Sequence, residues 1–218
     1  MSNSVASLVY MASHAVVTLH TWLSRVDALD CPDVMIFDLD PEQQDFGEVR
    51  SAAVHLRHQL DELGLAAFVK TTGLSGAHVV VPLDRSANFD EVRAFARAVA
   101  DQLVRRDPRR RTTEMRKDRR GGRLFVEVVR NAYGQTAVAP YSVRAAPGAP
   151  VAMPLAWSDL ESPRATSRSF TVRDVGQYVE ANGDAWSGMA RHARSLRAAM
   201  QLAKICGHAE APHVRRNR

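Results

Sequence analysis

Residues 33–41 read DVMIFDLDP, an apolar run that ends in two aspartates, Asp38 and Asp40, one residue apart. The run predicts a buried strand over residues 34–39, and side chains two residues apart on a strand lie on the same face. Two carboxylates on one face repel each other unless a positive group lies between them. A divalent cation such as Mg²⁺ or Mn²⁺, which prefers oxygen ligands, is one such group. The simpler alternative is that the strand ends here and that Asp40 and Pro41 begin a turn.

Strand and helix patterns continue outward from this strand as far as residue 141. Apolar residues at helical spacing predict two helices, the first ended by Gly64 and the second closed off by Pro108. The expected elements are a strand at 34–39, a helix at 46–63, strands at 65–71 and 78–83, a helix at 92–103, and strands at 123–130 and 135–141, with the turn NAYG between the last two. This order predicts an α+β fold with the β-α-β-β-α-β sheet of ferredoxin-like domains and RNA-recognition motifs.

In that topology the first strand lies between the third and the fourth and is antiparallel to both. Asp38 and Asp40 would then have His78 on one side and Glu127 on the other. A glutamate inside the apolar run LFVEVV is ordinarily explained by a solvated sheet face. With two aspartates on the neighbouring strand, a better explanation is a three-carboxylate cage for paired metal ions, as used in phosphoryl or nucleotidyl transfer.

A glycine-bearing turn in KTTGLSGAHVVV (residues 70–81) joins the second and third predicted strands. Backbone amides of such a turn, with Thr72, Ser75 and His78, can bind phosphates. Glycine and small polar residues are also what any hairpin requires, so the turn alone does not decide between the two. In APYSVR, Ser142 and Arg144 offer a hydroxyl and a guanidinium fork for phosphate, although a surface arginine explains the same residues.

Residues 145–170 are rich in Pro, Ala and Ser and are expected to be irregular. Helical patterns follow at 171–179 and 186–205, so we expect C-terminal helices beside the sheet. The chain of 218 residues fits one domain, at 1–206, followed by a disordered basic tail at 207–218.

The composition predicts a globular protein of a reducing compartment. Hydrophobic residues make up 45% of the chain, and no apolar run approaches the length of a membrane helix. The N-terminus has no basic region typical of a signal peptide. Cys31 and Cys206 are too far apart in sequence to suggest a disulfide framework or a zinc site. We therefore expect a cytoplasmic protein without a membrane partner.

Positive charge is concentrated in residues 105–123, RRDPRRRTTEMRKDRRGGR. This basic block holds ten Lys or Arg against three Asp or Glu, in a chain with a net charge of +5. Such a block on an otherwise slightly acidic chain is typical of a site for a polyanion such as nucleic acid. A solvated loop that confers solubility is the alternative.

Three longer stretches together resemble a known family. They are HTWLSRVDALDCPDVMIFDLDP, FVKTTGLSGAHVVVPL and LFVEVVRNAYGQTAVAPYSVRAAPGAPVAMPLAW. In order and spacing they are similar to the polymerase domain of bacterial ligase D, a member of the archaeo-eukaryotic primase superfamily that works in non-homologous end joining. The similarity runs from about Leu19 to the helix after Trp186, and the stretch around APYSVRAAPGAPVAMPLAW is the most specific.

The resemblance implies a primase-type catalytic core that adds NTP or dNTP substrates to a DNA end with two divalent ions, Mg²⁺ or Mn²⁺. Asp38 and Asp40 match the family's metal-binding pair, and Glu127 stands at its third carboxylate, usually an Asp. The nucleotide-binding positions are Thr72 (usually Ser), Ser75, His78 and Arg144. Lys117, Arg119 and Arg120 fall near the expected path of the template and primer. The implied partners are DNA ends, a DNA ligase and a Ku-like end-binding protein, all at the nucleoid.

Three departures from the family pattern motivate an alternative. The chain begins almost at HTWLSR, where the family normally has a further segment, so we expect an N-terminally shortened member. Ser75 stands where many members have Lys, and Glu127 is one methylene longer than Asp. The alternative is a catalytically degenerate DNA-binding remnant. A haloacid-dehalogenase-like phosphatase is a third hypothesis, because FDLD also begins that family's motif, but it requires Thr where this chain has Glu42.

Overall fold

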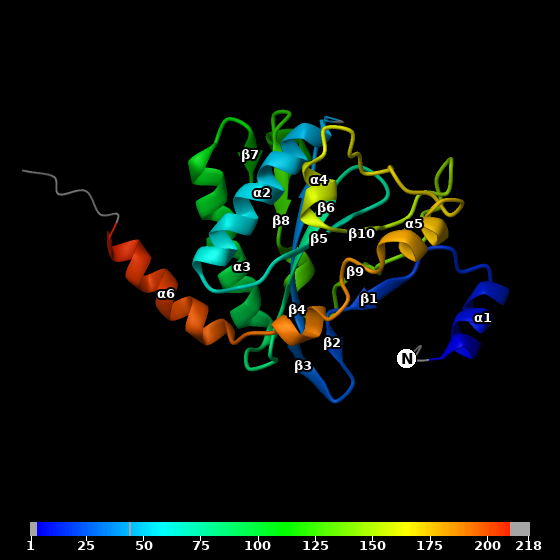
Figure 1. The fold of residues 1–218 in the computed structure, drawn as a ribbon. Coiled ribbons are helices and arrows are strands. Elements are labelled where there is room, and N and C mark those ends of the chain that lie inside the picture. The colour runs from blue at the N-terminus through cyan, green and yellow to red at the C-terminus, as the bar shows by residue number, and fades with distance from the viewer. Residues whose placement is uncertain (1–3, 44, 210–218) are drawn as a thin grey trace, which may run out of the picture.

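The computed structural model describes residues 4–43 and 45–209 (Figure 1). Its centre is a six-stranded sheet, and in spatial order the strands are β10 (Pro154–Leu155), β5 (Phe68–Thr71), β6 (Ala77–Pro82), β4 (Val34–Asp40), β8 (Leu124–Glu127) and β7 (Arg111–Thr112). β4 lies between β6 and β8 and is antiparallel to both, with Asp38 opposite His78 on one side and Glu127 on the other. The predicted α+β fold and the predicted neighbours of the first strand are confirmed.

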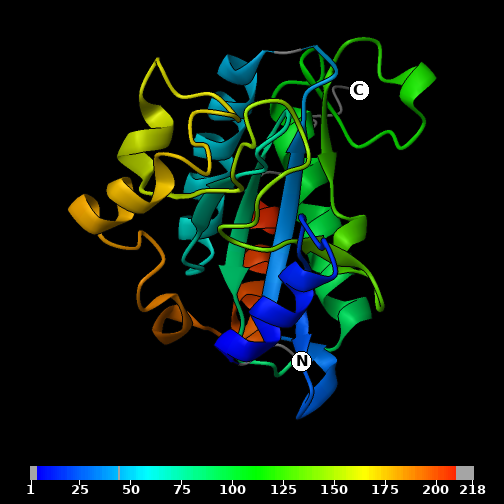
Figure 2. The same ribbon diagram turned by 90° about the vertical axis from the view of Figure 1, so that its right-hand side faces the viewer.

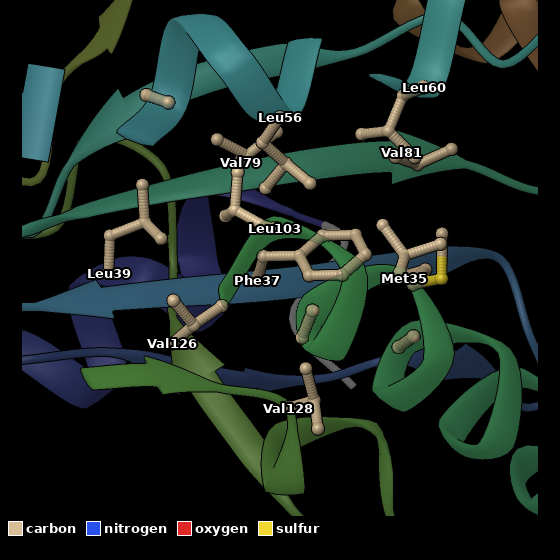
Figure 3. Packing of buried hydrophobic residues seen from close by; sticks show 14 of the residues in the cluster. Met35, Phe37, Leu39, Leu56, Leu60, Val79, Val81, Leu103, Val126 and Val128 are labelled. Atoms are coloured by element: carbon tan, nitrogen blue, oxygen red, sulfur yellow. The ribbon is translucent and has the colours of Figure 1, made fainter. Parts of the chain in front are cut away.

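Two long helices, α2 (Phe46–Glu62) and α3 (Phe89–Arg106), cover one face of this sheet (Figure 1). Each helix begins at a side-chain cap, because the Asp45 carboxylate accepts hydrogen bonds from backbone N–H groups of α2 and Asn88 forms a capping box with Glu91 in α3. Alternate residues of the strands meet the apolar stripes of the helices. Figure 3 shows this core, which includes Met35, Phe37, Leu39, Val79, Val81 and Val126 from the strands and Leu56, Leu60 and Leu103 from the helices.

The opposite face of the sheet carries a smaller layer, which Figure 2 turns towards the viewer. Here β1 (His20–Trp22) pairs antiparallel with β9 (Thr136–Val138) as a separate two-stranded sheet. β2 (Ser24–Arg25) and β3 (Ala28–Pro32) form another two-stranded sheet, a hairpin at the end of the main sheet where β4 begins (Figure 1). The predicted strand at 135–141 is therefore shorter than expected and lies outside the main sheet.

The chain leaves the main sheet after β8 because a side chain replaces the next strand partner. A short 3₁₀ helix, η2 (Val129–Asn131), follows β8, and the Asn131 side chain is fully buried. Its amide oxygen accepts a hydrogen bond from the Ile36 N–H at 2.8 Å, and its amide nitrogen donates to the Ile36 carbonyl at 2.7 Å. These two bonds satisfy the backbone of β4 at the point where β8 no longer does.

The segment 145–170, which we expected to be irregular, contains regular structure in two places. β10 pairs antiparallel with β5, and α4 (Trp157–Glu161) follows it. The sequence pattern does not reveal β10, because this strand is only two residues long and contains a proline. Pro154 lacks an N–H, which suits an edge strand.

The C-terminal helices are present, with bounds that differ from the prediction. They are α5 (Val175–Asn182), the 3₁₀ helix η3 (Met189–His192) and α6 (Leu196–Ala209). α5 begins later than expected because Asp174 first forms a turn, accepting hydrogen bonds from the N–H and hydroxyl of Thr171. Of the predicted tail, residues 207–209 belong to α6, and residues 210–218 lie outside the described part of the chain. A further helix, α1 (Val5–Ser13), precedes β1.

Within residues 4–43 and 45–209 there is no helix whose length and apolar character would let it span a bilayer.

Candidate active site

The face of the sheet opposite α2 and α3 contains a pocket of about 180 Å³. It is lined by His20, Asp38, Asp40, Thr72, Leu74, Ser75, His78, Glu127, Arg130, Val138 and Arg144. All seven residues that the sequence assigns to catalysis, metal binding or nucleotide binding are in this set. They come from three strands of the main sheet, from the turn between β5 and β6, and from the loop after β9.

Strand register places four titratable residues, three of which line the pocket, in one row across the sheet. Lys70 of β5 is opposite His78 of β6, which is opposite Asp38 of β4, which in turn is opposite Glu127 of β8. Directly paired residues of neighbouring strands have their side chains on the same face. The row therefore places two basic and two acidic side chains over one face of four adjacent strands.

Arg130 supplies a positive group between Asp38 and Glu127. Its Nε lies 3.3 Å from Oδ2 of Asp38 and 3.3 Å from Oε1 of Glu127. Asp38 is only 7% exposed, and its Oδ2 also lies 3.4 Å from Nε2 of His78. Burial alone would raise the pKa of Asp38, but His78 and Arg130 outweigh it and hold the pKa below the usual value. The pKa of Glu127 is raised, first by burial and then by the charge of Asp38.

The second aspartate of the pair has different partners. Asp40 accepts a hydrogen bond from the Ser75 hydroxyl at 3.2 Å, and its other oxygen lies 3.7 Å from Nη1 of Arg120. The Arg120 guanidinium in turn lies 3.8 Å from the centroid of the Phe125 ring. At position 75 this chain therefore has a hydroxyl that holds Asp40.

The chemistry of the three carboxylates fits divalent ions, although their described conformation does not form a metal cluster. Asp38, Asp40 and Glu127 offer oxygen ligands from adjacent strands to one pocket, which is the ligand type that Mg²⁺ and Mn²⁺ prefer. Among the described residues, no three or more His, Cys, Asp or Glu side chains are gathered closely enough to hold a metal ion. Arginine side chains pair with the carboxylates instead.

The turn between β5 and β6 has glycine where the chain must pass close to other backbone. A Cβ on Gly76 would lie 1.9 Å from the Leu39 carbonyl oxygen, so only glycine lets the turn pack against the end of β4. Gly73 has a φ of +73°, and a Cβ there would lie 2.7 Å from Cγ of Arg144. The two glycines thus bring the turn against both the aspartate strand and the arginine.

Within this turn the Thr72 hydroxyl has a structural task. It accepts hydrogen bonds from the N–H groups of Leu74 and Gly76 and donates to the Gly76 carbonyl at 3.1 Å. The sequence placed Thr72 among the nucleotide-binding residues. In the structure Thr72 lines the pocket while its hydroxyl shapes the turn that carries Ser75.

Sequence reasoning missed two polar residues of the pocket, His20 and Arg130. Both are within stretches that carried the family resemblance, HTWLSR and EVVRNAYG, but neither has a local pattern that singles it out. Arg130 is brought back to Glu127 by the turn of η2. The pKa of His20 is lowered, first by burial and then by the charges of Arg144 and Arg130.

The basic block lies beside the pocket rather than in it. Lys117 and Arg119 are exposed on a 3₁₀ helix, η1 (Lys117–Arg119), and only Arg120 reaches a pocket residue. The block is anchored at Arg111, which is 2% exposed and whose Nε lies 2.8 Å from Oε1 of Glu48. The prediction that Lys117, Arg119 and Arg120 bind DNA stays a prediction, with two of the three side chains open to solvent.

The fold and the pocket define an α+β domain in which a mixed six-stranded sheet presents three carboxylates, and the segments beside it two arginines, at one site. The sequence model of the family described as "LigD, primase-polymerase domain" matches residues 1–186. A multifunctional non-homologous end joining protein LigD of Pseudomonas aeruginosa is 35% identical over 201 residues, which are 91% of this chain and 24% of that protein. The chain belongs to the family of LigD primase-polymerase domains.

Further similarities extend to another relative and to a solved structure. The bifunctional non-homologous end joining protein LigD of Bacillus subtilis is 30% identical over 154 residues, covering 70% of this chain and 25% of that protein. This chain thus spans about a quarter of the length of both curated relatives. The polymerase domain of Mycobacterium tuberculosis Ligase D, solved in complex with DNA, matches with a TM-score of 0.80 and 27% identity over 88% of this chain and 70% of that one.

Proposed function

We propose that this domain is a template-dependent nucleotidyltransferase that adds ribo- or deoxyribonucleotides to DNA ends in non-homologous end joining. The observation that carries the proposal is the convergence of seven independently predicted residues on one pocket. Family membership supports the reaction class, and the names of the relatives support the repair pathway. The DNA bound to the Mycobacterium tuberculosis domain supports DNA as the partner.

Asp38, Asp40 and Glu127 would hold two Mg²⁺ or Mn²⁺ ions, which when bound supply activation of the primer 3′-hydroxyl and charge neutralisation of the leaving pyrophosphate. The chain's own cations orient the nucleotide. Arg144 is half-buried, and its planar guanidinium suits two phosphate oxygens at once. Burial lowers the pKa of Arg144 and the charge of Asp38 opposes this shift. A guanidinium keeps its proton in proteins, so Arg144 is cationic beside the carboxylates.

Binding of a nucleotide with metal ions would require the ion pairs of Arg130 in the pocket to be exchanged. Arg130 pairs with Asp38 and Glu127 in the described conformation, and a metal ion needs the same oxygens. Released from these carboxylates, the Arg130 guanidinium becomes available to a phosphate oxygen. The exposed Lys117 and Arg119 would contact the phosphate backbone of the DNA end. The protein partners would be a DNA ligase and a Ku-like end-binding protein, at the nucleoid in the cytoplasm.

The test is extension of a gapped or overhanging duplex with Mn²⁺ and each of the NTP and dNTP sets. We expect the wild-type protein to add nucleotides and Asp38→Asn/Asp40→Asn to lose about a thousand-fold in rate, since metal ions contribute several kcal/mol to such reactions. Asp33→Asn is the matched control, because Asp33 precedes β4 and pairs with Arg25 outside the pocket. Incorporation that survived the double substitution would exclude this metal site.

The same assay decides between this function and a DNA-binding remnant. The pairing of every pocket carboxylate with an arginine is the observation that favours the remnant, since such pairs can be permanent. Salt-sensitive binding of duplex DNA without Mn²⁺-dependent incorporation would establish it. Family membership leaves the dehalogenase-like phosphatase hypothesis without support.

A further inference from the structure

A lysine lies buried beside the pocket, on the same face of the sheet. Lys70 is 1% exposed, and it stands at the end of the charged row, opposite His78. Its Nζ has no hydrogen-bond partner among the described residues. A buried ammonium without a partner costs several kcal/mol, so an apolar residue of similar length would fold more stably at this position. Stability therefore does not explain why the chain has a lysine here.

His78, the residue opposite, has the complementary unsatisfied group. Its Nε2 lies 3.4 Å from Oδ2 of Asp38, and its Nδ1 is buried without a partner among the described residues. A carboxylate only accepts, so the ring nitrogen that faces Asp38 carries the hydrogen. In the neutral ring the other nitrogen, Nδ1, is then an acceptor. Two directly paired residues thus carry complementary groups, an acceptor without a donor on His78 and an ammonium with three donors and no acceptor on Lys70.

We propose that Lys70 is a positioning residue that acts through His78: its ammonium donates to Nδ1 of His78 through one buried water and, together with Asp38, holds the Nε2–H tautomer that faces the pocket. The inference rests on the proposed function in one respect, namely that the Nε2–H then serves a phosphate oxygen of the nucleotide. Such outer partners of a histidine fix both its tautomer and the orientation of its ring.

The charges around Lys70 agree with this role. Burial lowers the pKa of Lys70 to about 7, the charge of Asp38 opposes the shift, and Arg144 and Arg130 add to it. The ammonium is thus coupled to the acidic pocket. Because Lys70 does not itself line the pocket, it acts on the nucleotide through His78.

The first experiment measures the His78 tautomer in the ligand-free protein by long-range ¹H–¹⁵N NMR of the imidazole rings, with His78→Gln to assign the signal. We expect the wild-type ring to be the Nε2–H tautomer and Lys70→Met to convert it to a mixture. Lys70→Gln, which keeps N–H donors, is expected to retain the Nε2–H form and serves if Lys70→Met does not fold. A wild-type ring protonated on Nδ1, or a ring unchanged in Lys70→Met, overturns the proposal.

The second experiment measures binding of ATP with Mn²⁺ by calorimetry. We expect Lys70→Met to weaken ATP binding by about 10-fold or more. In the His78→Gln background the same change should have no further effect, because residues that act through one another are not additive. Equal losses in both backgrounds, or unchanged binding, would show that Lys70 does not act through His78.

These measurements separate the two proposals. The tautomer is observed without substrate and without turnover. An Nε2–H ring that responds to Lys70→Met in a protein that incorporates no nucleotide would support the Lys70–His78 link and count against the proposed function.

Discussion

The two faces of the central sheet are built from the same strands and have opposite chemistry. Along β4, Met35, Phe37 and Leu39 point towards α2 and α3, whereas Asp38 and Asp40 point into the pocket. β6 alternates in the same way, with Val79 on the core side. Along one strand, a core side chain is thus followed directly by a charged or polar one. Because side chains alternate with a period of two, the core residues lie on one face of the sheet and the pocket residues on the other.

The difference between the faces shows that the charged side chains of the pocket face lower the stability of the fold and that the apolar face must offset this loss. Buried charges of the row, such as Lys70 and Asp38, destabilise the fold unless other charges neutralise them. Arg130 neutralises Asp38, and Nε2 of His78 lies 3.4 Å from the same carboxylate, but Lys70 has no such partner among the described residues. Packing on the apolar face must therefore offset the free energy lost by burying charge on the other face. Each of the following predictions tests whether stability and chemistry are separated between the two faces in this way.

The largest expected effect is on the apolar face. Phe37 is fully buried in the core beneath the two helices, so Phe37→Ala should lower the free energy of unfolding by about 3–5 kcal/mol. We expect the fraction that remains folded at low temperature to keep its nucleotide incorporation within about threefold, because Phe37 does not face the pocket. Urea unfolding and a primer-extension assay measure the two quantities.

Asp38→Asn, one residue along the same strand but on the pocket face, is the matched variant with the opposite expected effects. It should abolish incorporation while changing the free energy of unfolding far less than Phe37→Ala does. If Phe37→Ala abolished activity in protein shown to be folded by circular dichroism, the two faces would not be separable.

A smaller effect is expected from pH, through Lys70. Its pKa of about 7 in the folded protein lies below the 10.5 of an unburied lysine, owing to burial and to Arg144 and Arg130, with Asp38 opposing. Between these values the unfolded chain binds one more proton than the folded one, so the wild type gains stability as pH rises from 7 towards 10. Lys70→Met lacks this gain. We therefore expect it to be more stable than the wild type by a few kcal/mol at pH 7, with a difference that shrinks as pH rises.

Urea unfolding of both proteins at several pH values from about 6.5 to about 9.5 checks this, with His78 as the one other titrating neighbour on the facing strand. A difference that stayed constant with pH would mean that Lys70 keeps its ordinary pKa and that the charged face costs less than the comparison implies.

Sequence patterns predicted the apolar face and most of the pocket, for a physical reason. Periodicity determines which residues share a face, and the ferredoxin-like order determines which strands are neighbours, so these two rules together bring Asp38, His78 and Glu127 to one place. Lys70 escaped because a lone lysine in FVKT is the ordinary pattern of a solvated residue. Arg130 escaped because its position depends on η2, a tertiary feature with no period of its own. β10 escaped because edge pairing depends on a distant strand.

Asn131 joins the two faces, and its loss should have an intermediate effect. Its side-chain amide makes hydrogen bonds to the N–H and the carbonyl of Ile36 and also donates to Val128, which fixes η2 and with it Arg130. Asn131→Ala leaves buried backbone groups unpaired, so we expect a loss of about 1–3 kcal/mol in the free energy of unfolding, measured by urea denaturation. Incorporation in the primer-extension assay should also fall, because Arg130 is no longer held at Asp38.

Asn131→Asp is the control, since its oxygens can accept from the Ile36 N–H but cannot donate to the carbonyl. It should be destabilised too, and its activity should follow its stability. If Asn131→Ala kept full activity despite the lost stability, Arg130 would be placed independently of η2.

The smallest effect is expected where the charged face continues into the basic block. Lys117 and Arg119 are exposed and form no ion pair among the described residues, so they are available to DNA phosphates. Replacing both by Gln should weaken duplex binding severalfold and reduce the slope of log affinity against log salt by about 1.8, at about 0.9 per phosphate contact. Fluorescence anisotropy with a labelled duplex over a range of salt concentrations measures both.

The matched control removes two positive charges from the outer surface of α3, which covers the apolar face of the sheet. Arg93→Gln/Arg97→Gln alters two exposed arginines of α3, which pair with Asp90 and Asp101. If the basic block is the path of the DNA backbone, this control leaves the salt slope unchanged. An equal change for both double variants would mean that DNA responds to the net charge of the domain and not to a surface beside the pocket. The DNA-binding surface would then not extend from the pocket into the basic block, because Lys117 and Arg119 would contribute no more to DNA binding than two arginines of α3 on the other side of the sheet.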